Sequence, residues 1–427
     1  MRCTSRRDVL LGSSALSAAV LAGARPALTQ GAGDKFDLVI KGCEVLDPSQ
    51  GLKAKRDIAI RFGRIVELAA DIPAERGNRV LNAGGKLATP GLIDLHAHVF
   101  PYGSAIGIPA DELIQYQAAT TLVSAGDAGA NNIAAFRRFI VPQSRARLFA
   151  FVHIAVHGLT GFPVPELTNI DFAQTATAAR AIAENADIVL GAKVRMSENV
   201  IAKHGLEPLK RAIAACVQSG TPAKVMCHIG GVETPALMSQ ILDLLRAGDI
   251  LTHAYSGAPN NDGRFTNIVQ DGTLLPAAIE AKKRGVIFDV GHGGGSFDYT
   301  VAEVAMAGGA GPDVLSSDIH VFSANSPGMP YLTNVMSKFL NLGLSLEQVI
   351  TMATATPAKV INREPLLGTL KVGAPADVSF LDVVEGATEF VDTRNNTRPG
   401  KIQLKPAGVV IAGVPHGRPY GSPFAVR

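Results

Sequence analysis

The 427-residue sequence has little cysteine and little net charge. Beyond residue 30 only Cys43, Cys216 and Cys227 remain, and their wide spacing gives neither a disulfide framework nor a Cys-x-x-Cys zinc pattern. The formal net charge is +3, most of it near the N-terminus. Residues 31–427 hold 36 of the 40 Lys and Arg residues and 36 of the 37 Asp and Glu residues. This balance gives no support for a nucleic-acid partner.

The sequence also lacks an apolar run that would cross a bilayer comfortably. The run over 9–22 is short and is interrupted by Gly12, Ser13 and Ser14. A basic head containing Arg6 and Arg7 precedes it, and the two together resemble the twin-arginine export signal of bacteria. The alternatives are an ordinary secretory signal or a frayed cytoplasmic terminus. We expect residues 1–30 to be an export signal, without stable membrane insertion, and the protein to be periplasmic or secreted.

Composition and length predict a globular protein of more than one unit. Hydrophobic residues make up 47% and charged residues 18% of the chain. The length suits two domains, or one large barrel with an addition. Short strand-like runs separated by Gly- and Pro-containing turns occur before residue 90, and strand-like runs return at 376–382 and 408–414. We expect 31–90 and 366–427 to form one small β-sandwich.

Residues 91–365 show a different pattern, in which apolar strand-like runs alternate with helix-like stretches. Eight such runs occur, at 91–98, 120–123, 148–152, 188–193, 224–228, 250–253, 286–290 and 314–318. Alternation of this kind predicts parallel strands, and eight units predict an α/β protein with a (β/α)₈ TIM barrel. The spacing alone leaves an open doubly wound sheet as the alternative.

The first of these runs ends in a His-x-His pair. A turn at Thr89, Pro90 and Gly91 precedes it, and its length suits a buried strand. Because residues two apart on a strand share a face, His96 and His98 would direct two imidazoles to one point. Imidazole is a common ligand for zinc and similar ions. Two ordinary buried histidines are the alternative interpretation of the pair alone.

Further metal-compatible side chains end other predicted strands. Barrel enzymes carry their catalytic groups at the C-terminal ends of the strands. The residues that fall there are His96, His98, Lys193, His228, His253 and Asp318. Six such residues on five strands predict a metal centre.

The residue types suit a pair of divalent ions. Such a pair needs several neutral imidazoles and a bridging anion, and Lys193 becomes an anionic bridge if CO₂ carbamylates it. Metal binding lowers the pKa of water from about 15.7 to about 7 and polarises a scissile carbonyl. Asp318 would bind one ion, act as the general base, and pass the proton to the leaving group.

These residues, with the stretch 90–98 and the segment 368–377, resemble the amidohydrolase superfamily over residues 35–427. The resemblance implies a binuclear centre, with zinc as the favoured ion. It further implies that His96 and His98 hold the more buried ion and that His228 and His253 hold the more exposed one. Lys193 would bridge the two ions, and Asp318 would complete the first site.

The stretches 98–103, 191–195 and 290–293 look most like the amidohydrolase/deacetylase branch, a dihydroorotase-like group with esterase or deacetylase activity. Phe100 stands where dihydroorotases carry an arginine, which argues against hydrolysis of a pyrimidine ring. Arg195, two residues beyond Lys193, could bind a substrate carboxylate. His292 would contact substrate or close a turn, and Tyr255 would line the pocket or cap the next helix.

We therefore expect a metal-dependent hydrolase that removes an acyl, acetyl-like group from an amide or ester of a small organic acid. The alternatives are hydrolysis of a cyclic amide or a dipeptide at the same centre, or a non-catalytic scaffold that keeps the barrel. The expected partner is a small-molecule substrate, and a homo-oligomer is compatible with the sequence.

Overall fold

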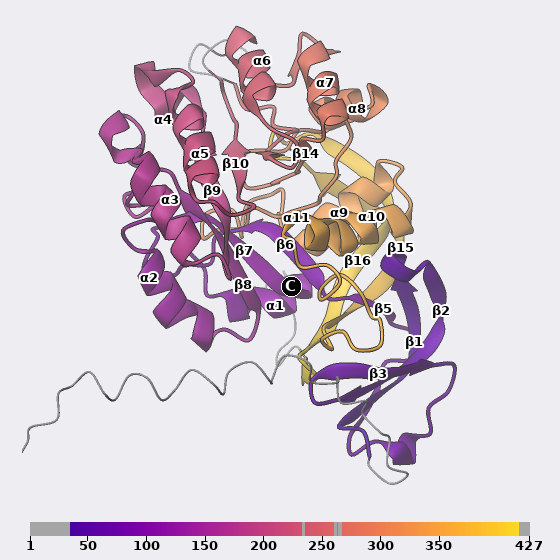
Figure 1. Ribbon diagram of the computed structural model, residues 1–427. Coiled ribbons are helices and arrows are strands. Elements are labelled where there is room, and N and C mark those ends of the chain that lie inside the picture. Colours follow the sequence, from indigo (N-terminus) through magenta and orange to yellow (C-terminus); the bar gives the residue numbers. More distant parts are fainter. Residues whose placement is uncertain (1–34, 233–234, 260–262, 264–266, 418–427) are drawn as a thin grey trace, which may run out of the picture. The chain divides into compact units, whose positions relative to one another are not determined.

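The computed structural model describes residues 35–232, 235–259, 263 and 267–417 (Figure 1). The predicted export segment, residues 1–30, lies outside them. The described residues from Phe36 onward belong to one compact unit.

Both ends of this unit build one β-sheet of eight strands. The strands are β1 (Leu38–Asp47), β2 (Leu52–Arg61), β3 (Arg64–Ala69), β4 (Val80–Asn82), β5 (Leu87–Pro90), β15 (Val378–Val391), β16 (Thr397–Ile411) and β17 (Val414–His416). Their order is β17-β16-β15-β5-β1-β2-β3, with β4 beside β1. The N-terminal and C-terminal parts meet where Ala88 pairs with Phe380 in antiparallel register.

A second sheet of seven parallel strands forms the barrel. The strands are β6 (Leu92–Ala97), β7 (Ala119–Gly129), β8 (Arg147–His153), β9 (Val189–Arg195), β10 (Lys224–His228), β11 (Ile250–Thr252) and β14 (Ile287–Phe288), in this order. The eighth predicted strand is irregular. It closes the ring through single parallel bridges, Val314 to Asp289 on one side and Ile319 to Ala97 on the other. The prediction of a TIM barrel with a β-domain built from both chain ends is confirmed.

Helices follow the barrel strands and cover the outside of the ring (Figure 1). They are α1 (Ala110–Gln117), α2 (Ile133–Ala135), α3 (Thr175–Glu184), α4 (Glu198–Ile201), α5 (Glu207–Gln218), α6 (Pro235–Leu244), α7 (Pro276–Arg284), α8 (Tyr299–Ala307), α9 (Leu332–Asn341), α10 (Leu346–Ala353) and α11 (Ala355–Val360). A short hairpin of β12 (Val269–Gln270) and β13 (Thr273–Leu274) precedes α7. No helix within the described ranges is long and apolar enough to span a bilayer.

Helix α5 shows how the sequence produces this packing. Pro208 occupies the first turn, where a missing N–H costs nothing. Leu209, Ala212 and Cys216 then recur at helical spacing and are buried against the barrel.

The three free cysteines, Cys43, Cys216 and Cys227, are all buried, and burial raises the pKa of the Cys216 thiol to about 12. They are therefore core residues without nucleophilic character.

Candidate metal centre

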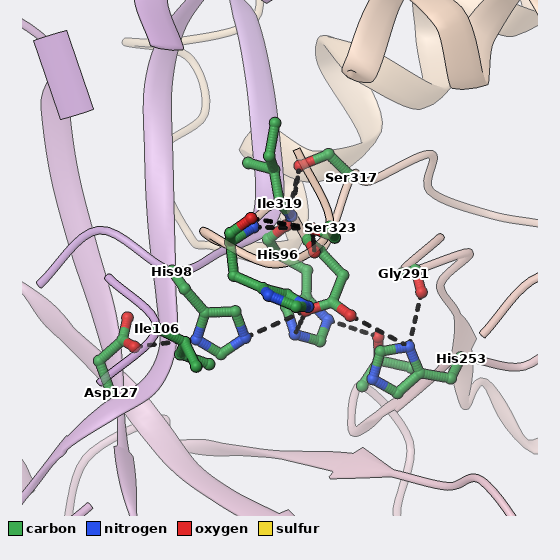
Figure 2. Close-up of polar contacts among 12 residues, drawn as sticks. His96, His98, Ile106, Asp127, His253, Gly291, Ser317, Ile319 and Ser323 are labelled. Atoms are coloured by element: carbon green, nitrogen blue, oxygen red, sulfur yellow. Dashed lines mark hydrogen bonds and ion pairs between the residues drawn. The ribbon is translucent and has the colours of Figure 1, made fainter. Parts of the chain in front are cut away.

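Two histidines of the first barrel strand and one aspartate of the irregular eighth segment meet at the C-terminal end of the barrel. The Nε2 atoms of His96 and His98 lie 3.1 and 3.0 Å from Oδ1 of Asp318 (Figure 2). One potential ligand atom from each of the three lies within 4.8 Å of the other two. Their backbones interlock as well, because the Asp318 N–H donates to the His96 carbonyl at 2.6 Å. The group is capable of holding a metal ion.

The other three predicted ligands join the same cluster. Lys193 on β9 places its Nζ 3.1 Å from Nε2 of His96. The ring of His253 lies 4.9 Å from that of His96 and 4.3 Å from that of His228, between centroids. Nε2 of His253 is buried and has no hydrogen-bond partner among the described residues. The structure thus brings together all six residues, and an orphaned imidazole nitrogen is what a metal would satisfy.

Hydrogen bonds at Nδ1 orient three of these imidazoles. Asp127 accepts from Nδ1 of His98 at 2.9 Å, and the Gly291 carbonyl accepts from Nδ1 of His253 at 2.6 Å (Figure 2). Thr252 donates its hydroxyl to Asp289 at 2.7 Å and therefore accepts from Nδ1 of His96 at 2.7 Å. Each Nδ1 thus serves as a donor, so the ring's Nε2 is the atom left to bind a cation.

Asp94 holds the segment that carries Asp318. Its buried carboxylate accepts from the Ser317 N–H at 2.9 Å, from the Ser317 hydroxyl, and from Gln117 at 2.9 Å. Asp318 has φ +48°, in the left-handed region that is unfavourable for residues other than glycine. The contacts of Asp94 therefore stabilise a backbone conformation that aims the Asp318 carboxylate at the histidines.

The charges of the cluster are those of a cation site. Burial lowers the pKa values of His228 and His253 well below the usual range, so both rings are neutral. Burial acts to raise the pKa of Asp318, but His96, His253 and the hydrogen bonds keep it well below the usual range. For His98, burial lowers the pKa, yet Asp127 and Asp318 raise it to about 9. The negative charge of Asp127 and Asp318, which favours protonation of His98, also favours a metal cation at this site.

Lys193 is suited to carbamylation. It is fully buried, and burial lowers its pKa to about 8, partly offset by Asp318. A neutral amine is therefore accessible near neutral pH, and the neutral amine is the form that reacts with CO₂.

The cluster forms one end of a cavity of about 350 Å³. Its walls combine apolar, cationic and glycine-rich parts: Ile106, Leu159, Phe162, Phe322, Arg195, His320, Gly294, Gly295, Ser296 and Ser326, beside His98, Lys193, His228 and Asp318. A cavity of this size and make-up fits a small molecule.

The three predicted substrate residues have different surroundings. Arg195 lines the cavity. Tyr255 is fully buried and donates its hydroxyl to the Ala310 carbonyl at 3.0 Å. His292 is also fully buried, with Nδ1 2.8 Å from the Gly293 carbonyl and Nε2 2.7 Å from Lys338. Neither ring is among those that line the cavity, whereas Arg195 is.

Sequence reasoning missed several residues that shape the site. Three of them lie near or after the end of a predicted strand: Asp127, Thr252 and Asp289. That position was the sequence signal by which they could have been found. His320 lies two residues beyond Asp318, with its ring centroid 5.8 Å from that of His98. Its Nδ1 accepts from the Phe322 N–H at 3.3 Å, which leaves Nε2 as a donor when the ring is neutral. Glu166, which pairs with Arg195, lies in a loop and carried no sequence signal.

A TIM barrel with imidazoles, a lysine and an aspartate at the ends of its strands defines a metal-dependent hydrolase. Comparison with known families makes this specific: a family model, described as the amidohydrolase family, matches residues 87–417. The chain belongs to the amidohydrolase family. The predicted resemblance and the prediction of a hydrolase are thereby confirmed.

Individual relatives agree with this assignment. A protein named deacetylase from Agrobacterium fabrum is 33% identical over 82% of this chain and 83% of its own length. Another named deacetylase, from Enterococcus faecalis, is 30% identical over 88% of this chain and 98% of its own. Among solved structures, one described as a dihydroorotase is 31% identical and has a TM-score of 0.80, covering 89% of this chain and 97% of its own. One described as an adenine deaminase has a TM-score of 0.80 at 29% identity, covering 90% of this chain and 100% of its own.

Proposed function

We propose that this enzyme removes an acyl group from an amide or ester of a small organic acid. The observation that carries the proposal is one cavity lined by Arg195 together with His98, Lys193, His228 and Asp318, four of the six clustered residues. The names of the deacetylase relatives support the same reaction class.

The residues take the following roles in this proposal. His96, His98 and Asp318 would hold one divalent ion, and His228 and His253 would hold a second, with zinc as the favoured ion. Lys193, once carbamylated, would supply an anionic ligand to these ions. When bound, the ions lower the pKa of a water molecule and polarise the scissile carbonyl. Asp318 accepts the proton of the attacking water and delivers it to the leaving amine or alcohol.

The other residues that line the cavity indicate the chemistry of the acid part of the substrate. Arg195 provides a planar cation for a carboxylate. Ile106, Leu159, Phe162 and Phe322 provide an apolar wall on which a hydrocarbon group would be buried.

Metal analysis of the purified protein tests the proposal directly. We expect close to two divalent ions per chain by elemental analysis, and loss of both bound metal and activity in Lys193→Ala. Lys282→Ala is the matched control, because its ammonium pairs with Asp313 at 2.7 Å and does not line the cavity. An active enzyme without metal would overturn the proposal.

Hydrolysis of a cyclic amide or a dipeptide is the second candidate, favoured by the structural similarity to a dihydroorotase. Phe100 argues against the pyrimidine-ring case, because its buried ring packs on Phe136 at 5.4 Å between centroids and adds no cation to the cavity. Rates on N-acyl amino acids, acyl esters and cyclic imides, measured side by side, separate the two candidates.

We also propose export, on the basis of Arg6 and Arg7 ahead of an apolar run. In a bacterial host with a twin-arginine translocase, the unaltered chain is expected in the periplasmic fraction. The double change Arg6→Lys and Arg7→Lys should keep it in the cytoplasm. Periplasmic recovery of the double variant would contradict this route.

A further inference from the structure

Behind Arg195 lies a buried acid that the proposed reaction does not use. Glu166 belongs to the loop between β8 and α3 and is 3% exposed. Both of its carboxylate oxygens contact Nη1 of Arg195, at 3.1 and 3.3 Å. Oε1 also lies 3.1 Å from Nε2 of His153, without hydrogen-bond geometry. Arg195 lines the cavity and Glu166 does not, so the acid supports the arginine from outside.

The acid is charged under ordinary conditions. Burial acts to raise the pKa of Glu166, but the guanidinium of Arg195 and the ring of His153 lower it to about 2. Nδ1 of His153 accepts from the Ala155 N–H at 3.0 Å, so a neutral ring carries its proton on Nε2, toward Glu166. Glu166 is thus a carboxylate that accepts from Arg195 at the end of β9 and lies beside the ring of His153 at the end of the neighbouring strand β8.

This arrangement divides the guanidinium into two parts. Nη1 is occupied by Glu166, whereas Nε and Nη2 donate to no acceptor among the residues that the structure describes. The edge formed by Nε and Nη2 can bind a carboxylate through two parallel hydrogen bonds. The Phe162 ring, 5.8 Å from Cζ of Arg195, flanks the group on the cavity wall.

We propose that Glu166 is a positioning residue that fixes Arg195 by Nη1 and leaves the opposite edge for one substrate carboxylate. The inference rests on the proposed function, which assigns Arg195 to a substrate acid. It adds the charge of the substrate: because one edge of Arg195 is left, the cavity accepts one carboxylate, and the negative charge of Glu166 disfavours a second acidic group nearby.

The test uses the metal-loaded full chain, the best acyl substrate from the panel described above, and the carboxamide of that substrate. Glu166→Gln should raise KM for the carboxylate about tenfold, the size of one oriented charge-assisted contact. It should change KM for the carboxamide less than about twofold and leave kcat nearly unaltered. Glutamine has only one acceptor oxygen, so Nη1 of Arg195 keeps at most one of its two contacts with the residue at position 166.

A double-mutant cycle separates positioning from general support of the loop. Arg195→Met should abolish the preference for the carboxylate, and Glu166→Gln should then have no further effect on KM. Glu166→Asp keeps the charge and should give an intermediate KM, and it serves also if the glutamine variant folds poorly. Glu303→Gln is the matched control, since it removes a comparable partner of an arginine, Arg398, away from the cavity.

The outcomes are distinguishable. If Glu166→Gln raises KM equally for both substrates, or has an equal effect in the Arg195→Met background, Glu166 only supports the loop and the inference is wrong. If Arg195→Met leaves the preference for the carboxylate intact, the assignment of Arg195 to the substrate acid fails instead. A dicarboxylate hydrolysed as well as its monocarboxylate analogue would contradict the charge limit.

Discussion

At the scale of single residues, the orientation of the imidazoles decides what the cluster can bind. His96, His98 and His253 each donate through Nδ1 to an oxygen of the protein. Their Nε2 atoms therefore face one region before any ion binds, and this reduces the cost of ordering the ligands. For His96 the orienting group is the hydroxyl of Thr252, which Asp289 holds in turn.

Replacement of Thr252 by valine tests this orientation. Thr252→Val conserves shape but leaves Nδ1 of His96 without an acceptor, so either tautomer becomes available to the ring. Loss of such a supporting hydrogen bond typically weakens metal affinity about 10–100-fold, and we expect a loss in this range by chelator competition. Thr121→Val is the control, because that buried hydroxyl on β7 has no hydrogen-bond partner among the described residues. Equal affinities in both variants would contradict the role of Thr252.

Asp94 has its effect through Ser317. In Asp94→Asn an amide replaces the carboxylate that accepts four hydrogen bonds, so at least one buried donor loses its acceptor. We expect a loss of about 1–3 kcal/mol in the free energy of unfolding and, because Asp318 shifts, a fall in kcat of about tenfold or more. Urea denaturation and steady-state kinetics measure the two effects.

The control for Asp94 is Asp298→Asn. Asp298 is also buried, and it caps α8 by accepting from the Thr300 N–H at 2.8 Å. Its replacement should lower stability and leave kcat close to that of the unaltered enzyme. If Asp94→Asn behaves in the same way, Asp94 stabilises the fold without positioning Asp318.

At the scale of elements, one buried lysine joins three segments around the cavity. Lys338 on α9 donates to Nε2 of His292 at 2.7 Å, to the Gly328 carbonyl at 2.6 Å and to the Val391 carbonyl at 2.7 Å. The first two segments also supply cavity residues, Gly294 and Ser326, and the third is the end of β15. Lys338 thus links the β-domain to the loops that shape the substrate cavity.

Lys338→Met removes this link without removing bulk. Two buried acceptors and one partly buried acceptor then lose their donor, and we expect the free energy of unfolding to fall by about 3 kcal/mol. KM should rise because the glycine-rich loop loses its support, whereas the bound metal should remain. Equilibrium unfolding in urea, metal analysis and KM check the three expectations.

Lys224→Met is the comparison for that change, since its ammonium has a single side-chain partner, Asn362, at 3.0 Å. A Lys338→Met protein with unaltered KM would show that the cavity loops are held by other contacts.

At the scale of the whole molecule, periodicity was sufficient to predict the barrel but not its closure. Strands such as β8 are continuous apolar runs with distinct boundaries, and the order of β6 to β14 follows from them. The eighth segment contains Ser316, Ser317 and Asp318, whose hydrogen bonds go to side chains and single backbone partners rather than to a regular ladder. Polar side chains here form hydrogen bonds to the backbone in place of a neighbouring strand, and the periodicity of a sequence does not show where this happens.

The residues of the site also differ in whether the sequence alone could predict their positions. The clustering of the six predicted ligands could be predicted because each ends a predicted strand, and strand ends meet on one face of a barrel. The groups that orient them could not, because Glu166 meets Arg195 across 29 positions of chain and Asp289 acts through Thr252 across 37. The path of a loop, which determines such pairs, is not encoded by periodicity. His292 illustrates the same point, since its place after a strand left substrate contact or a turn as alternatives, and its contacts with Lys338 and Gly293 depend on the path of the chain.

Metal binding should also close the barrel. The predicted ligands come from β6, β9, β10, the end of β11 and the irregular segment around Asp318, and this last segment has only single bridges to its neighbours. An ion shared by Asp318, His96 and His98 would therefore supply a cross-link where the ladder is weakest.

The ion should bind the folded chain and not the unfolded chain. Metal at 100 times its Kd should therefore add about 2.7 kcal/mol to the free energy of unfolding. Urea denaturation with and without a chelator measures this difference, and hydrogen exchange should show the largest loss of protection at 314–319. Asp318→Asn should reduce the difference while β8 and β9 keep their protection, and a chelator effect of unchanged size in that variant would place the stabilising ion elsewhere.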